Sequence, residues 1–128
     1  MVVGGNWSGI YSIMHCSDTS TFNLCPNIIG GSFTLMLVQS GSSLSGTMVF
    51  GQISGRVTGS ATSAGIVTIN PWSQTIPLVA PATAVWRVSA ARFQVSGNSM
   101  TGSFHVNVTS TASFGALDFD GNLVDVVR

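Results

Sequence analysis

Apolar and polar residues alternate along much of the chain between residues 31 and 109. In one stretch Phe33, Leu35 and Leu37 recur at every second position, and residues 100–109 repeat this spacing with Thr, Ser, His and Asn in between. A side-chain period of two is typical of β-strands with one dry face and one wet face. Short Ser-Gly and Gly-Asn segments interrupt the alternation and predict tight turns. The pattern therefore predicts an antiparallel all-β protein.

The alternation and its interruptions also predict where the strands lie. We expect strands at residues 7–14, 32–39, 44–50, 53–61, 66–69, 84–95, 99–109, 114–119 and 123–127. Prolines between residues 70 and 83 predict an ordered irregular loop there, and Asp120-Gly121-Asn122 predicts a hairpin turn. No stretch shows a sustained helical period with caps, so little helix is expected.

The length of 128 residues fits a single domain, residues 1–128, that can bury a working core. Successive short reversals make a meander, and a long twisted meander removes its free edges by closing. We therefore predict an antiparallel up-and-down barrel of about eight strands. The alternative is a two-sheet β-sandwich, for which only segments 15–30 and 70–83 could serve as crossover connections.

Charged residues are scarce, which narrows the range of partners. The chain has four arginines, four aspartates, no lysine and no glutamate, so only 6% of its residues are charged. Nucleic acid requires clustered cations against phosphates and is therefore not an expected partner. A net charge of zero gives little electrostatic protection from self-association, so a homo-oligomer is compatible with the sequence.

The hydropathy pattern predicts no membrane partner. No apolar run reaches the roughly 20 residues that span a bilayer as a helix, and Thr, Ser and Asn dominate the alternate faces of the strands. Residues 1–5 lack the basic region of a signal peptide. Because the composition nevertheless resembles that of exported proteins, we expect a bacterial secreted domain, extracellular or periplasmic, that is part of a longer precursor.

The cysteines, Cys16 and Cys25, lie nine residues apart in a polar segment. A disulfide between them would close the first long loop, stabilise the fold by about 3 kcal/mol and fit an oxidising compartment. Free thiols are the alternative. A metal site built with His15 and Asp18 lacks the usual ligand spacing, so we expect no metal and no other cofactor.

The segments Trp7-Ser8-Gly9-Ile10-Tyr11 and Gln39-Ser40-Gly41-Ser42-Ser43-Leu44-Ser45-Gly46-Thr47 resemble the first hairpin of avidin-like barrels, within the wider class of lipocalin-like (calycin-type) barrels. The chain also resembles the Gly/Ser/Thr-rich C-terminal β-domains of secreted bacterial proteins. The resemblance covers about a third of the chain and implies a barrel. It implies no particular ligand, because the cysteine loop separates the first two strands and the full set of biotin-contacting residues has no counterpart.

Aromatic side chains are the candidate ligand-binding residues, since indole and phenol rings offer flat apolar area and one polar group. The candidates are Trp7, Tyr11, Trp72, Trp86 and the neighbouring Arg87. The alternative is that Trp7, Tyr11 and Trp86 belong to the core. Trp72 lies in the proline-rich segment, where exposure is expected. Arg87 faces inward if the strand is regular, and a bulge near residues 89–91 would return it to solvent.

Carboxylates and histidines offer a different interpretation, a hydrolytic site. Asp118 and Asp120 are two residues apart and would share one strand face, about 7 Å apart, as in an inverting glycosidase pair. His15 and Asp18 form a second candidate group. We expect both aspartates, like His105, to face solvent, because Leu117 and Phe119 occupy the dry face.

These observations favour a secreted, non-enzymatic barrel module that binds a small neutral or sugar-like ligand. The second hypothesis is a structural or adhesive module that oligomerises through its uncharged faces. The third is a small hydrolase, glycosidase-like or esterase-like, that uses Asp118 and Asp120 or His15 and Asp18.

Overall fold

The computed structural model describes residues 2–19, 25–79, 81–111 and 115–128. Its elements are β1 (Gly5–Asp18), a short 3-10 turn η1 (Cys25–Asn27), β2 (Gly31–Ser40), β3 (Ser43–Phe50), β4 (Ile53–Ala61), β5 (Ile66–Ile69), β6 (Trp72–Pro77), β7 (Thr83–Val88), β8 (Ala91–Ser96), β9 (Ser99–Ser110) and β10 (Ala116–Val127). Within these ranges, no helix is long and apolar enough to cross a membrane.

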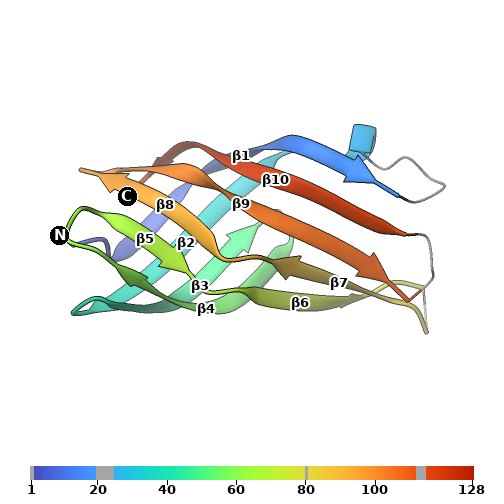
Figure 1. Ribbon diagram of the computed structural model, residues 1–128, viewed down its shortest axis with the longest axis horizontal. Helices are drawn as coiled ribbons and strands as arrows, with labels where there is room; N and C mark the ends of the chain where they lie inside the picture. Colours follow the sequence, from blue (N-terminus) through green and yellow to red (C-terminus); the bar gives the residue numbers. More distant parts are fainter. Residues whose placement is uncertain (1, 20–24, 80, 112–114) are drawn as a thin grey trace.

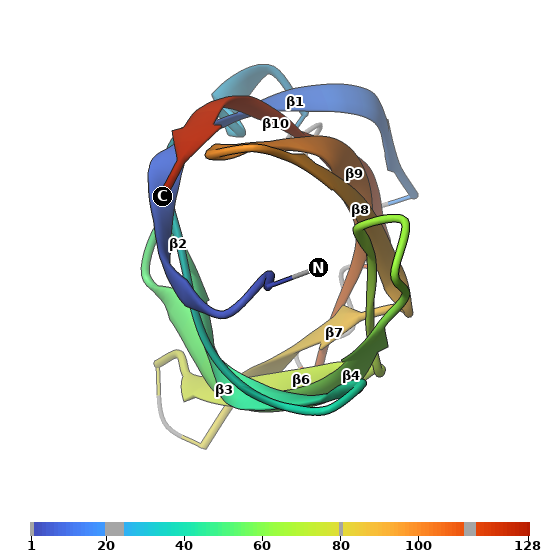
Figure 2. The same cartoon turned by 90° about the vertical axis from the view of Figure 1, so that its left-hand side faces the viewer.

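The strands close into an antiparallel eight-stranded barrel (Figures 1 and 2). The ring runs β10-β1-β2-β3-β4-β5-β8-β9 and returns to β10, which pairs with both β1 and β9. The two remaining strands, β6 and β7, extend the wall by pairing with each other and, through β7, with β9. The predicted meander barrel is confirmed. The sandwich alternative is wrong, because the first and last strands are hydrogen-bonded along their length.

The strand pairs β5/β6 and β7/β8 behave as two long strands that break at the same level. Ile69 pairs with Ala91, and the next pair is Trp72 with Val88, so residues 70–71 lie opposite 89–90. The predicted irregularity near 89–91 is therefore present. The irregularity interrupts the alternation of inward and outward positions between β7 and β8. Arg87 and Arg92 can therefore both be exposed. A regular strand over 84–95 would have turned one of the two arginines inward.

The expected loop over residues 70–83 is wrong for β6 (Trp72–Pro77), which pairs with β7 throughout. The prolines explain why the strand survives. Pro71 lies in the break before β6, Pro77 is its last residue, and Pro81 lies in the connection that follows. None of them removes a backbone donor from the middle of the ladder.

The expected hairpin at Asp120-Gly121-Asn122 is also wrong, because β10 runs through it without a turn. Gly121 is buried and faces the interior, where a Cβ atom would lie 2.4 Å from Cζ of Phe104. The glycine therefore makes room for an aromatic ring on the neighbouring strand. Position 114, where we expected the preceding strand to begin, lies outside the described residues.

Apolar side chains fill most of the barrel, and the described residues include no buried polar or charged residue. Aromatic rings form a continuous contact chain through the middle of the barrel. The ring centroids of Phe50 and Phe104 lie 4.9 Å apart, and Phe33 stacks on Phe104. Burial of such rings is the main stabilising contribution expected for a domain of this size.

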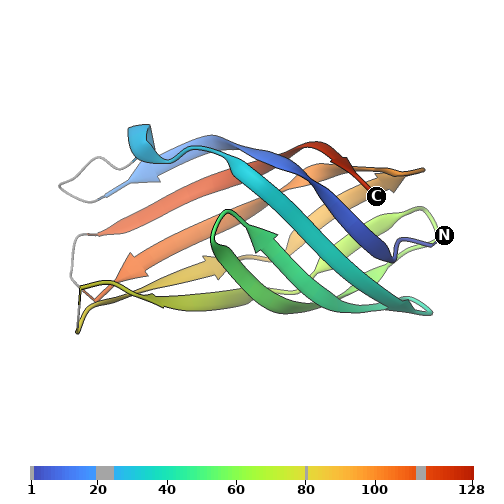
Figure 3. The ribbon, with the colours of Figure 1, turned by 180° about the vertical axis from the view of Figure 1, so that it is seen from behind.

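One end of the barrel is closed by Trp7, which is fully buried. Its indole Nε1 donates to the carbonyl of Val3 at 2.9 Å, and the guanidinium of Arg128 lies 4.6 Å from the ring centroid. Arg128 also donates to the carbonyls of Val2 and Gly4, which fastens the last strand to the first. Figures 2 and 3 show both termini at this end.

Strands β4 and β6 lie next to each other in the lower wall of the barrel in Figure 1, and we call the boundary between them the seam. Among the described residues, β4 pairs with β5 but not with β6. Side chains bridge the seam instead. The backbone N–H of Ser54 donates to Oε1 of Gln74 at 2.9 Å, and Trp72 lies directly over Gly55.

We predict that Gly55→Ala destabilises the protein by about 1–3 kcal/mol, because overpacking a filled core displaces its side chains. The added Cβ would lie 2.4 Å from Cε3 of Trp72, so the indole must move away from the seam. The free energy of unfolding from urea titration measures the effect. The exposed neighbour provides the control, since Ser54→Ala should change stability by less than about 0.5 kcal/mol. Equal stability of the two variants would show that the indole does not rest on β4.

Candidate functional site

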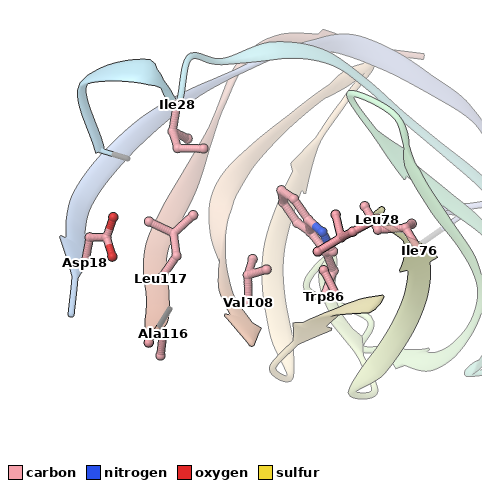
Figure 4. A pocket seen from close by; sticks show the side chains of 10 residues that line it. Asp18, Ile28, Ile76, Leu78, Trp86, Val108, Ala116 and Leu117 are labelled. Atoms are coloured by element: carbon pink, nitrogen blue, oxygen red, sulfur yellow. The ribbon is translucent and has the colours of Figure 1, made fainter. Parts of the chain in front are cut away.

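The end of the barrel opposite Trp7 contains a pocket with a volume of about 190 Å³ (Figure 4). It lies where β1 ends and where β6 meets β7 and β9 meets β10, close to η1. Its lining residues are Asp18, Ile28, Ile76, Leu78, Ala84, Trp86, Val108, Gly115, Ala116 and Leu117. We call this the open-end pocket.

The open-end pocket is lined mainly by aliphatic side chains. Ile28, Ile76 and Leu117 contribute aliphatic side chains to it, and Val108 and Ala84 complete the walls. The lining residues with polar side-chain groups are Asp18 and Trp86, and the indole N–H of Trp86 is itself buried. Such a surface attracts apolar molecules through the hydrophobic effect and offers few positions for specific hydrogen bonds.

Asp18 reaches the pocket because of a bulge in β1. Met14 pairs with Asp120 and Ser17 with Asp118, so β1 contains one extra residue at this point. His15 takes up the irregularity with a φ of 53°. Beyond the bulge the inward and outward positions exchange, so His15 is exposed while Asp18 lies at the pocket. The two residues, which we grouped in one candidate hydrolytic site, lie on opposite faces of the wall.

The predicted disulfide between Cys16 and Cys25 is confirmed, and the free-thiol alternative is wrong. Both cysteines and Ile28 pack against the core. The backbone N–H of Ile28 donates to the carbonyl of Cys25 at 3.2 Å, which continues η1 toward the pocket wall. The disulfide therefore holds the segment that carries Ile28 against the barrel end. It also suggests an oxidising, extracellular-type environment.

Trp86 lines the open-end pocket and also a second hollow of about 250 Å³ in the side of the barrel. That hollow is lined by Tyr11, Phe50, Gly51, Gln52, Ile53, Ile76 and Trp86. The indole ring contacts Phe119 at a centroid distance of 6.2 Å and Phe50 at 6.4 Å. Its Nε1 atom is buried and has no hydrogen-bond partner.

The structure scatters the other candidate ligand-binding residues. Trp7 closes the opposite end, and Trp72 packs at the seam beside Phe50. Tyr11 lines the side hollow, and burial raises the pKa of its hydroxyl above the usual value of 10. Arg87 lies on the outer surface, where its guanidinium donates to the hydroxyl of Thr109 at 2.6 Å. Of this set, Trp86 is the residue that lines the open-end pocket.

Sequence reasoning missed most of the pocket wall, which includes Ile28, Ile76, Leu78, Val108 and Leu117. Ordinary aliphatic residues at the ends of strands carry no chemical signal that separates a pocket from a core. The alternation does place Val108 and Leu117 on the dry face. It does not reveal which end of a barrel remains unfilled.

Histidines and aspartates form a second cluster, on the outside of the barrel. The ring of His105 lies between two carboxylates, with Nδ1 2.8 Å from Asp120 and Nε2 3.0 Å from Asp118. His15 adds Nδ1 at 3.0 Å from the second oxygen of Asp120, and the side-chain amide of Asn107 donates to Asp118 at 3.2 Å. We call this group the outer His–Asp cluster. As expected, both aspartates and His105 face outward.

The outer His–Asp cluster favours the charged form of His105. Both ring nitrogens can donate only when the imidazole is protonated, and both face carboxylate oxygens. The hydrogen bond to Asp120 accordingly raises the pKa of His105, and the same bond lowers the pKa of Asp120. In the described ranges, no three His, Cys, Asp or Glu side chains are arranged to hold a metal ion.

Comparison of the chain with protein-family models, with curated proteins and with solved structures finds no match. The closed barrel is consistent with a calycin-like architecture, as the resemblance of the first hairpin implied. Functional conclusions therefore depend on the geometry of the two sites described above.

We predict that His105→Gln lowers stability most between about pH 4 and pH 6.5. The raised pKa of His105 contributes stability that is present below its unfolded pKa, near 6.5, and is lost as the pH rises through the folded value. The lowered pKa of Asp120 contributes above its unfolded pKa, near 3.9, and is lost as the pH falls through the folded value. Both side chains are partly exposed, so the effect should remain below about 1 kcal/mol.

Chemical unfolding of the wild type and of His105→Gln at pH 3.5, 5 and 8 measures this difference. Asp120→Asn is the matched variant, because it removes the same ion pair. Its loss in free energy of unfolding should likewise be smaller at pH 8 than at pH 5. If His105→Gln lowers the free energy of unfolding equally at all three pH values, the pKa of His105 is not raised by the cluster.

Proposed function

We propose that this protein binds a small apolar molecule in the open-end pocket and does not act as an enzyme. The main support for the proposal is a pocket of about 190 Å³ with aliphatic walls at the end of a barrel whose interior is mostly filled by side chains. An apolar cavity of about 150 Å³ is large enough to bind benzene. The open-end pocket therefore suits a compact ligand of about seven to ten non-hydrogen atoms.

The wall chemistry favours an apolar ligand over a sugar. A buried sugar needs a hydrogen-bond partner for nearly every hydroxyl, because unpaired polar groups lose their hydration without compensation. Ile28, Ile76 and Leu117 supply none from their side chains. Among the neutral ligands that the sequence suggests, the pocket thus favours hydrocarbon-rich molecules.

The surroundings of the site fit a secreted binding module. The Cys16–Cys25 disulfide supports the segment that bears Ile28 and would persist only where the environment is oxidising. We therefore extend the proposal to a role outside the cytoplasm.

We predict that Ala84→Phe abolishes binding of toluene and butylbenzene. Ala84 is buried on β7 and lines the pocket, so a phenylalanine there occupies the space of the ligand. For the wild type, toluene at ten times its Kd should raise the free energy of unfolding by about 1.4 kcal/mol. Thermal unfolding and ligand-detected NMR measure the stabilisation and the binding.

Val85→Phe is the control, since Val85 is the next residue on β7 and does not line the open-end pocket. This variant should bind toluene as the wild type does. Glucose should bind to neither protein. Binding of glucose without toluene, or toluene binding that survives Ala84→Phe, would refute the proposed function.

Self-association is a second candidate function, supported by apolar side chains on the outer surface. Ile10 on β1 and Met36 and Val38 on β2 are about half exposed or more, at 51%, 49% and 69%. These neighbouring strands are seen from outside in Figure 3. If this face joins two copies, Val38→Asp should shift the sedimentation of a dimer to that of a monomer, whereas Ser40→Asp at the end of β2 should not. A wild type that sediments as a monomer at 100 µM would exclude this role.

A further inference from the structure

The indole N–H of Trp86 is a buried hydrogen-bond donor without a partner. Burying such a donor unpaired costs about 1–3 kcal/mol, and native proteins pair the large majority of their buried polar side-chain atoms. The neighbouring ring of Phe119, nearly perpendicular at 75°, can offer only a weak N–H···π contact in place of a hydrogen bond.

The position of this donor connects it with the open-end pocket. Trp86 pairs across the sheet with Val108, and both residues line the pocket beside Ile76 and Leu78 (Figure 4). The rest of the lining is aliphatic apart from Asp18, so the indole is the one neutral side-chain donor in the described wall. A ligand acceptor at this wall would therefore find a single donor.

Two hollows border the indole, because Trp86 lines both the open-end pocket and the side hollow of about 250 Å³. Leu78, which lies next to the indole in the pocket wall, is on the connection after β6 and is 40% exposed. Because Nε1 is buried, contact between the N–H and a ligand in the open-end pocket requires the ring to tilt and Leu78 to move aside.

We propose that the ligand is a compact apolar molecule with one hydrogen-bond acceptor, such as a ketone or ester carbonyl, and that the acceptor binds the indole N–H of Trp86. This inference rests on the proposed function and adds the chemical class of the ligand. A molecule of this class satisfies the unpaired donor and buries its hydrocarbon part against Ile28, Val108 and Leu117.

Acetophenone and α-methylstyrene test the proposal, because they have nearly the same shape and differ by a carbonyl oxygen in place of a methylene group. The ratio of their dissociation constants is measured for the wild type and for Trp86→Phe by ligand-detected NMR. Loss of the donor should reduce the relative preference for acetophenone by about fivefold, as expected for one net hydrogen bond. Comparing ratios removes the difference in hydration between the two probes.

Trp72→Phe is the matched control. Trp72 Nε1 is likewise buried without a partner, but Trp72 does not line the open-end pocket, so its removal should leave the ratio unchanged. In the wild type, acetophenone and not α-methylstyrene should shift the indole ¹H–¹⁵N resonance of Trp86 downfield, a readout that does not depend on folding of the variants.

The possible outcomes separate the two proposals. If both probes bind but Trp86→Phe leaves their ratio unchanged, or both probes shift the indole resonance alike, the acceptor inference is wrong and the apolar pocket stands. If neither probe binds to the wild type, the proposed function fails together with the inference.

Discussion

Limited interior space constrains how side chains pack in this closed barrel. An eight-stranded barrel has an interior just wide enough for its inward side chains, so each bulky ring requires a small neighbour. Trp72 lies over Gly55, and Phe104 lies over Gly121, in both cases where a Cβ would be too close to the ring. The glycines thus do not loosen the strands. They provide the space in which the aromatic contact chain around Phe50 can pack.

The two ends of the barrel satisfy this constraint differently. At one end Trp7 fills the interior, pairs its indole N–H with the carbonyl of Val3 and is covered by Arg128. At the other end Trp86 borders two hollows, and its indole N–H is unpaired. Tryptophan therefore fills the interior with its N–H hydrogen-bonded at one end, and lines a pocket with its N–H unpaired at the other. A ligand site is expected where packing and hydrogen bonding are both left incomplete.

Irregularities of one or two residues decide which side chains reach which face. The bulge at His15 and Cys16 turns Asp18 toward the pocket and His15 toward the outer His–Asp cluster. The paired breaks at 70–71 and 89–90 leave Arg87 and Arg92 in solvent. A side-chain period of two reverses with every such insertion, so bulges have large effects on a barrel.

The all-β class, the meander and the positions of most strands could be predicted from the sequence, because alternation and turn residues act locally. The sequence favoured the Cys16–Cys25 disulfide but left free thiols open, and the structure shows the disulfide. It also placed Asp118, Asp120 and His105 correctly on the wet face. Local signals misled at Asp120-Gly121-Asn122 and at Trp72–Pro77, where ring packing and strand pairing override turn preference. Which end stays open, and that Trp86 lines a pocket while Trp7 closes the core, became visible only in the folded barrel. Those outcomes depend on the sum of side-chain volumes along the barrel axis, which no stretch of sequence contains alone.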